Sequence, residues 1–261
     1  MEFSGRSFAP PTCHAVPRAK FGVDGGGTGK RKPAANPVYR NVSGGSHAQS
    51  LGELGRLAAG LGKRNELWQD QTLLQRIFYR NWNQHRGSLY YRRLYELRRV
   101  LRILAQTAVR ELLEQLLAAF YDPETRRKDR KVAAWTTLPC VLFTAKVAGR
   151  VAMVAKLASK VQQASMAVYV QFAAQTAQTL FMPLALVVQG LAARVFLVAG
   201  QWHQDLVAVY VLLAQWLPHL PACPDTLQGR PVDVAAGLPA ADDLQLPLPL
   251  DAPPMEAVRR H

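Results

Sequence analysis

The residues with the most distinctive chemistry lie between Leu73 and Leu104, where arginines alternate with aromatic side chains. All eight basic residues of this segment are arginines and its only acid is Glu96, so its formal charge is +7 (eight minus one). The guanidinium group binds phosphate through paired hydrogen bonds and stacks on flat rings. Unpaired RNA bases stack on aromatic side chains and on arginine. The segment therefore predicts an RNA-binding surface, and the alternative is a surface that binds an acidic partner protein.

Some of the aromatic residues are expected to serve the core instead, Phe78 and Tyr91 above all. Beside them, the sequence NWNQHR (residues 81–86) turns the apolar stripe of the predicted helix polar for two turns. Three interpretations stay open. The helix breaks near Gly87, with Asn81 or Asn83 as an N-cap. The polar side chains form an internal hydrogen-bond network, because an unpaired buried polar group costs about 1–3 kcal/mol. Or they face an RNA groove or a partner.

His85 is a poor candidate for catalysis, because no carboxylate or nucleophile neighbours it in the sequence. The three cysteines, Cys13, Cys140 and Cys223, are far apart and lack metal-ligand spacing. The glycine-rich stretch GGGTGKR has neither the spacing nor the Ser or Thr of a phosphate loop. We therefore expect no enzymatic activity, no cofactor, no metal and no small-molecule substrate.

The formal net charge of +14 and the pI of about 10.1 indicate a polyanionic partner. The cysteine pattern fits a reducing compartment, and the N-terminus has no apolar run of signal-peptide length. The basic residues of the N-terminal arm are either nuclear-targeting residues or a solvated basic arm. They are Arg18, Lys20, Lys30, Arg31 and Lys32.

Apolar periodicity predicts an all-α fold, an antiparallel bundle of about four long helices over residues 66–220. The helical stretches are expected at about 66–120, 138–178 and 180–217, the last with a split near Gly200. Residues 1–65 are expected to be a disordered basic Gly/Pro-rich arm, with at most a weak helix or linker at 51–62, and residues 221–261 a disordered Pro-rich acidic tail. A basic linker joins the first two stretches and is expected to face RNA through Arg126, Arg127, Lys128, Arg130 and Lys131.

The third stretch is also about as long and apolar as a membrane span. Gln189 and Arg194 lie in its middle, and a central arginine costs about 2.5–3.5 kcal/mol on insertion. A helix that is apolar on all sides also describes the central helix of a bundle. We expect no membrane association, and a helical membrane protein remains the less favoured alternative.

The segment YRNWNQHRGSLYYRRLYELRRVLR, residues 79–102, resembles the signature of the nucleolus and neural progenitor protein family. It also resembles the RNA-binding domain of the RNase MRP-specific protein subunit. The family often has a basic residue where this chain has Trp82, and weaker similarity covers roughly residues 66–220. The positions that carry the resemblance are Asn81, Asn83, Gln84, His85, Arg86, Tyr90, Tyr91, Arg93, Leu94, Leu97, Arg98 and Arg99.

The resemblance implies a nuclear, nucleolar location and a non-catalytic role in the processing of precursor ribosomal RNA. The implied partners are RNase MRP RNA, with RNase P RNA as an alternative, and the protein subunits of that particle. A protein-interaction scaffold of the same particle, with little RNA contact, is the alternative function. From the segment and the resemblance together, the predicted RNA-binding residues are Arg80, Asn81, Asn83, Gln84, His85, Arg86, Tyr90, Tyr91, Arg92, Arg93, Arg98 and Arg99.

Overall fold

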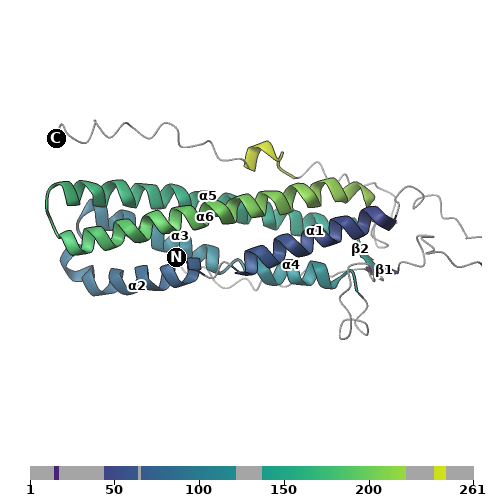
Figure 1. Cartoon of the computed structure of the whole chain (residues 1–261), viewed down its shortest axis with the longest axis horizontal. Helices are drawn as coiled ribbons and strands as arrows, with labels where there is room; N and C mark the ends of the chain where they lie inside the picture. Colours follow the sequence, from purple (N-terminus) through teal and green to yellow (C-terminus); the bar gives the residue numbers. More distant parts are fainter. Residues whose placement is uncertain (1–14, 18–43, 64–65, 122–136, 222–237, 245–261) are drawn as a thin grey trace, which may run out of the picture. The chain divides into compact units, whose positions relative to one another are not determined.

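The fold is all-α, as the periodicity predicts, with one short pair of strands added (Figure 1). The structure is a computed structural model that describes residues 15–17, 44–63, 66–121, 137–221 and 238–244. The helices are α1 (Gly44–Lys63), α2 (Glu66–His85), α3 (Leu89–Ala105), α4 (Val109–Ala118), α5 (Val141–Ala177) and α6 (Met182–Trp216). The strands β1 (Ala15–Pro17) and β2 (Thr137–Pro139) pair antiparallel, with Val16 opposite Leu138. Short 3₁₀ turns lie at Leu217–His219 and Asp242–Leu244.

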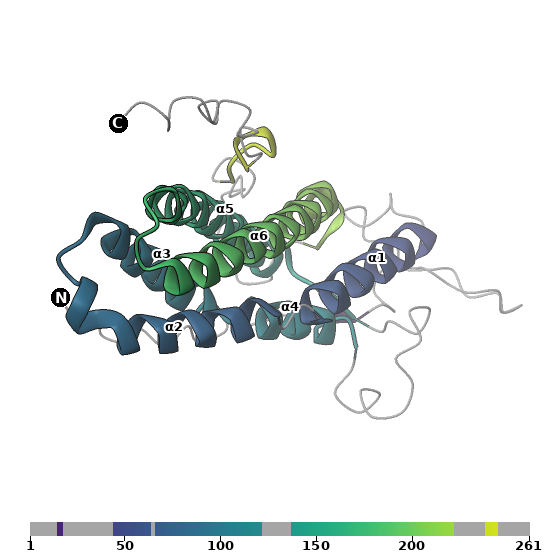
Figure 2. The same ribbon diagram turned by 60° about the vertical axis from the view of Figure 1, so that its left-hand side comes forward.

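The chain divides into two compact units, and α5 and α6 contribute to both. The first unit comprises Met1–Ala59, Val109–Val151 and Ala208–Pro239, and the second Gly60–Ala108, Ala152–Val207 and Ala240–His261. The second unit is a four-helix bundle of α2, α3, the C-terminal part of α5 and the N-terminal part of α6. Within each unit α5 and α6 lie side by side and antiparallel (Figures 1 and 2).

Leucine spacing explains the core of the second unit. The leucines of α3 recur every three or four residues, which places them on one helix face. They are all at most 1% exposed: Leu94, Leu97, Leu101 and Leu104. In the same unit α5 buries small residues such as Ala155 and Ala158. The apolar periodicity of the sequence therefore predicts the packed face of α3, except at Leu89, which is 58% exposed.

The predicted first helical stretch is three helices in the structure, not one. It breaks at residues 86–88, between α2 and α3, and again at residues 106–108, between α3 and α4. Gly87 explains the first break, because glycine is a poor helix former and the Ser88 hydroxyl donates a hydrogen bond to the carbonyl of His85. At the second break Ala108 adopts a positive φ of 47°, a left-handed backbone conformation that separates α3 from α4.

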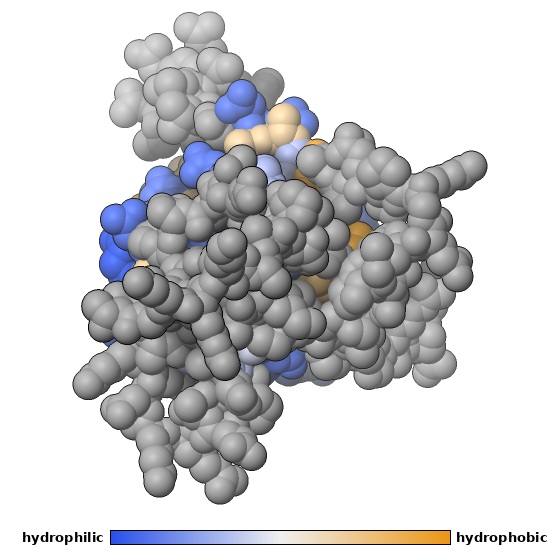
Figure 3. Space-filling view, turned by 90° about the vertical axis from the view of Figure 1, so that its right-hand side faces the viewer, coloured by the Kyte–Doolittle hydropathy of each residue, from blue (hydrophilic) through white to orange (hydrophobic). Residues whose placement is uncertain are grey.

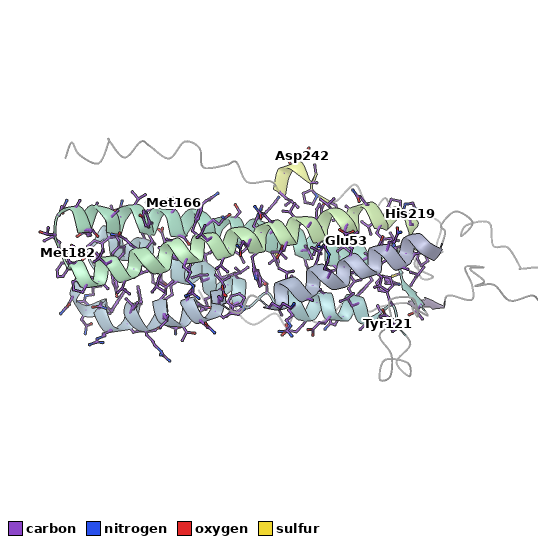
Figure 4. All side chains as sticks on the ribbon, in the orientation of Figure 1. Glu53, Tyr121, Met166, Met182, His219 and Asp242 are labelled. Carbon is purple, nitrogen blue, oxygen red and sulfur yellow. The ribbon has the colours of Figure 1, made fainter. Side chains whose placement is uncertain are left out.

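The two long helices match the predicted stretches more closely. The sequence predicts helix over about 138–178 and the structure has α5 at Val141–Ala177. The split expected near Gly200 is absent, and α6 continues to Trp216, where Pro218 stops it. Glycine inside a helix costs only about 1 kcal/mol, which the packing around α6 overcomes. Figure 4 shows the turn between the two helices beside Met182.

Residues 44–63 form α1, so the helix alternative for residues 51–62 is right and the helix begins earlier, at Gly44. The expectation of a disordered arm is wrong for these residues outside 51–62 and for residues 15–17, which form β1. Leu51 and Leu54 of α1 are buried, so this helix is stabilised by packing despite its glycines. Within the same unit the Nε1 atom of Trp216 donates a hydrogen bond of 2.8 Å to Nδ1 of His47. The basic residues interpreted as either nuclear-targeting residues or a solvated arm, Arg18 to Lys32, lie outside the described residues.

Part of the predicted acidic tail also has a defined place. Leu244 is buried, and its carbonyl oxygen lies 2.8 Å from Nε2 of His203. The hydroxyl of Tyr210 donates to the carbonyl of Pro239. A tail of this composition is expected to stay unpacked, but these buried partners hold residues 238–244 against α6. Residues 222–237 and 245–261, and the basic linker from Arg126 to Lys131, lie outside the described ranges.

One described helix is long and apolar enough to cross a membrane by length and composition, the one that spans Met182–His219. About a third of its most apolar window (33%) is buried inside the protein, and the core helix of a soluble protein meets the same criteria. Where Figure 3 shows described residues, hydrophilic side chains line one edge of the view and hydrophobic ones appear in small areas.

Candidate nucleic-acid interface

The arginine-rich segment folds back on itself as the α2–α3 hairpin of the second unit (Figure 2). The inner side of the hairpin is aromatic: the rings of Phe78 and Tyr91 stack with their centroids 5.0 Å apart. The buried Tyr91 hydroxyl donates a hydrogen bond to the carbonyl of Phe78. Burial is the main reason that the pKa of Tyr91 rises to about 12. This pair fixes the two helices, and with them everything on their outer side.

The solvent-exposed side of the hairpin, its outer side, is rich in guanidinium groups. Seven arginines are exposed there: Arg76, Arg80, Arg86, Arg92, Arg93, Arg99 and Arg102. Glu96 is the only acid of α3, and its carboxylate lies 2.9 Å from Arg93. Both side chains of that pair are about half exposed, so the pair stabilises the fold little. The remaining positive charge is free to attract a polyanion.

Arg98 is the exception among the arginines. Its guanidinium carbon lies over three aromatic rings, 4.2 Å from the centroid of Phe78, 4.9 Å from Tyr79 and 5.5 Å from Tyr95. Its Nη1 atom is buried and donates no hydrogen bond to any of the described residues. Cation–π stacking of this kind stabilises by about 0.5–2 kcal/mol. Arg98 therefore holds the aromatic layer in place, while Tyr79 and Tyr95 keep exposed ring area beside it.

The structure separates the twelve predicted RNA-binding residues into three groups. Those exposed on the outer side are Arg80, Asn83, Gln84, Arg86, Arg92, Arg93 and Arg99. Those half-buried are Asn81, Tyr90 and Arg98. His85 and Tyr91 are buried, at 4% and 1% exposure. The last two hold the hairpin together through ring contacts in its core, and RNA contact by any of the twelve residues stays a prediction.

His85 sits in an aromatic pocket at the end of α2. Its Nδ1 atom lies 2.7 Å from the hydroxyl oxygen of Tyr90, and the ring of Phe181 packs edge-on against it at 4.5 Å. Burial lowers the pKa of His85 below its usual 6.5, which favours the neutral ring. The internal-network interpretation of NWNQHR is therefore right for His85, with Tyr90 as its partner.

The other polar residues of NWNQHR behave differently. The amide of Asn81 donates to the carbonyl of Ile77 one turn earlier in the same helix. Asn83 and Gln84 are exposed. Neither asparagine caps a helix, because α2 continues through them to His85, and Ser88 is the N-cap residue of α3. The N-cap interpretation is wrong although the break near Gly87 is real.

The family described as nucleolus and neural progenitor protein, N-terminal, matches residues 31–214, which include the whole hairpin. The chain belongs to this family. No curated protein and no solved structure matches it. The matched region begins before α1, so the family domain includes this helix, which lies within the predicted N-terminal arm.

The hairpin also exposes residues that are not among the predicted RNA contacts. Arg76 lies one turn before Arg80 on α2, and Arg102 lies three residues after Arg99 on α3. Tyr79 and Tyr95 flank the Arg98 stack and remain partly exposed. Helical spacing already groups these residues with the predicted ones. Among the described residues no group of three or more His, Cys, Asp or Glu is arranged to hold a metal ion.

Proposed function

We propose that the chain is a non-catalytic RNA-binding subunit of RNase MRP, or of a related nucleolar ribonucleoprotein, that acts in precursor ribosomal RNA processing. Its partners are the particle's RNA, with RNase P RNA as a second candidate, and its protein subunits. Catalysis in such a particle belongs to the RNA, so the chain binds and positions. The single observation that supports this most is the outer side of the α2–α3 hairpin, where exposed arginines surround partly exposed tyrosines.

The chemistry of that surface fits a structured RNA. Arg92 and Arg99 are seven residues apart, two turns of helix, so both project from the same stripe of α3. Tyr79 and Tyr95 offer ring faces on which an unpaired base can stack, at about 1–3 kcal/mol for each base. Phosphate contacts supply affinity, and stacking favours single-stranded loops over duplex.

Salt dependence of RNA binding tests the proposal. The affinity of the purified full chain for RNase MRP RNA is measured from low to physiological salt, for the wild type and for Arg92→Ala/Arg99→Ala. We expect the slope of log affinity against log salt to become shallower by about two units or less, because two phosphate contacts are lost.

The matched control is Arg110→Ala. Arg110 is exposed on α4 and pairs with Glu114 at 3.0 Å, so its loss removes a charge of the same kind from a helix that is not part of the hairpin. Its slope should match the wild type. An unchanged slope in the double variant, or no preference of the folded protein for RNA over an uncharged polymer at low salt, contradicts the proposal.

Crosslinking in cells separates this function from the scaffold alternative. RNA adducts on residues 79–99 support direct RNA binding. A chain that co-purifies with the particle but forms adducts only through other subunits is a scaffold. Sequencing of the co-purified RNA identifies which RNA is bound.

A further inference from the structure

The first half of α6 presents an apolar stripe to solvent that nothing in the described structure covers. Leu186 and Val187 are both 53% exposed and Leu197 is 64% exposed. With Gly190 between them, they follow helical spacing along one outward face. Their other face is well packed, since Val188 and Val195 are fully buried. Exposed apolar side chains in a row, on a helix that is otherwise firmly packed, mark a binding surface.

Leu73 of α2 extends this apolar surface. Trp68 packs on Trp202 and His85 on Phe181, so α2 and α6 run antiparallel. Asp70 pairs with Arg194, and Leu73 lies one turn further along α2. It is therefore level with the turn of α6 that contains Gly190, and it is 43% exposed.

Gly190 gives a second, independent indication. A methyl group added to its Cα would meet nothing within 4 Å. The protein's own packing therefore does not need a glycine there, although glycine in mid-helix costs about 1 kcal/mol relative to alanine. A glycine on an open helix face lets the backbone of another helix approach closely.

The charged groups beside the apolar stripe indicate what kind of partner binds there. Arg194 lies within the stripe with its side chain 51% exposed. A second copy of this chain would bring two such arginines and two net charges of +14 together. A bilayer is disfavoured because the stripe contains Arg194 and the buried Asp70 carboxylate beside it. A protein helix with an acidic flank satisfies both the apolar and the basic parts.

We propose that the stripe formed by Leu73, Leu186, Val187, Gly190 and Leu197 docks an amphipathic helix of another protein, with acidic residues beside its apolar face. The helix lies along α6 with leucine-like residues at three- and four-residue spacing, and a carboxylate faces Arg194. This surface is separate from the outer side of the α2–α3 hairpin, so the chain binds RNA and a protein subunit through different residues.

Site-specific photocrosslinking in cells tests this. A benzophenone amino acid replaces Leu197 in the full chain, and the same group at Met153, 49% exposed on α5, is the matched control. We expect adducts at Leu197 well above those at Met153. Mass spectrometry should place them in an acidic amphipathic helix of another protein. Adducts to lipid, to a second copy or to this chain's own terminal segments, or adducts no stronger than the control, overturn the proposal.

A charge-neutral variant then tests the contact itself. Leu186→Gln/Leu197→Gln leaves the net charge unchanged. Because it alters only exposed side chains, we expect the variant to fold normally, and thermal unfolding checks this. Binding of the crosslinked partner segment, made as a peptide, should weaken about tenfold or more. RNA affinity and its salt slope should stay at wild-type values. Unchanged peptide binding contradicts the docking surface, whereas a loss of RNA affinity would contradict the separation of the two surfaces.

Discussion

The guanidinium group of Arg98 lies over the ring of Phe78, with 4.2 Å between the guanidinium carbon and the ring centroid. The same ring stacks on Tyr91 from the other helix of the hairpin. One arginine, one phenylalanine and one tyrosine thus form a layered contact between α2 and α3. The arginine run is therefore not uniform: adjacent arginines in the sequence have different roles in the structure.

Arg98→Ala and Arg99→Ala separate these roles. Loss of Arg98 removes the cation–π layer and should lower the free energy of unfolding by about 1–2 kcal/mol. Loss of the exposed Arg99 should leave stability within about 0.5 kcal/mol of the wild type and lower the salt slope of RNA binding by about one unit. Denaturant unfolding and RNA titration measure the two effects. Equal stability losses in both variants would contradict the assignment.

Tyr91→Phe tests the buried hydroxyl through alkaline pH. The pKa of Tyr91 is raised from 10.0 to about 12, chiefly by burial, so the folded state holds the phenol proton more tightly than the unfolded state. The protonated phenol of Tyr91 stabilises the folded state fully below pH 10, and this stabilisation is lost as the pH rises towards about 12. We expect Tyr91→Phe to be less stable at pH 8 by about 0.5–1.5 kcal/mol, the value of a hydrogen bond.

That stability gap should narrow between pH 10 and 12, because the variant has no buried phenol to ionise. Tyr79→Phe is the matched control, since Tyr79 is 61% exposed. Its unfolding free energy should follow the wild type across the same range. A constant gap for Tyr91→Phe over the whole range would show that the buried hydroxyl does not titrate with folding.

Local periodicity is sufficient to predict much of this fold. Leu94, Leu97 and Leu101 have a 3–4 residue spacing that only a helix can bury on one face, so the α3 core is readable from the sequence. The full length of α1 cannot be predicted in this way. Its four glycines between residues 51 and 62 oppose helix formation, and the packing of Leu51 and Leu54 against distant segments offsets them.

The candidate surface was predictable in its charge but not in its details. Arg98 and Arg99 have the same chemistry in the sequence, and only the partner helix decides which one stacks on Phe78. From the sequence, His85 is a polar residue predicted to contact RNA. In the structure it is buried, partly by Phe181, which lies almost a hundred residues away in the sequence. Which of these side chains are buried depends on how distant segments pack together, and helical spacing alone cannot predict that.

Asp70→Asn probes the buried carboxylate of the second unit. Asp70 is 1% exposed and lies 3.1 Å from Nε of Arg194, without the geometry of a hydrogen bond. Burial raises the pKa of Asp70 above its usual 3.8, although Arg194 acts in the opposite direction. The folded state thus favours the protonated carboxyl, and stability from this group is lost as the pH rises through the raised pKa.

Asparagine mimics the protonated form, so Asp70→Asn should be more stable than the wild type at pH 7. The two proteins should converge below pH 3.8, where Asp70 is protonated in both states. Thermal unfolding from pH 3.5 to 8 measures this difference. Glu66→Gln, at an exposed position of the same helix, is the control and should show no such trend. A less stable Asp70→Asn at pH 7 would mean that the Arg194 pair outweighs burial.

Two glycines of α6 test whether its outward face is open: Gly190 lies in the apolar stripe, and Gly200 lies against the side chain of Gln162. A methyl group at Gly190 meets nothing within 4 Å, so Gly190→Ala should raise the free energy of unfolding by about 1 kcal/mol through helix propensity alone. At Gly200 the added carbon would lie 2.4 Å from Nε2 of Gln162, which donates a 3.3 Å hydrogen bond to the carbonyl of Phe196. Gly200→Ala must displace that buried amide and should gain less than Gly190→Ala, or lose stability. Denaturant unfolding of both variants decides, and an equal gain at the two positions would show that Gln162 is not held where the structure places it.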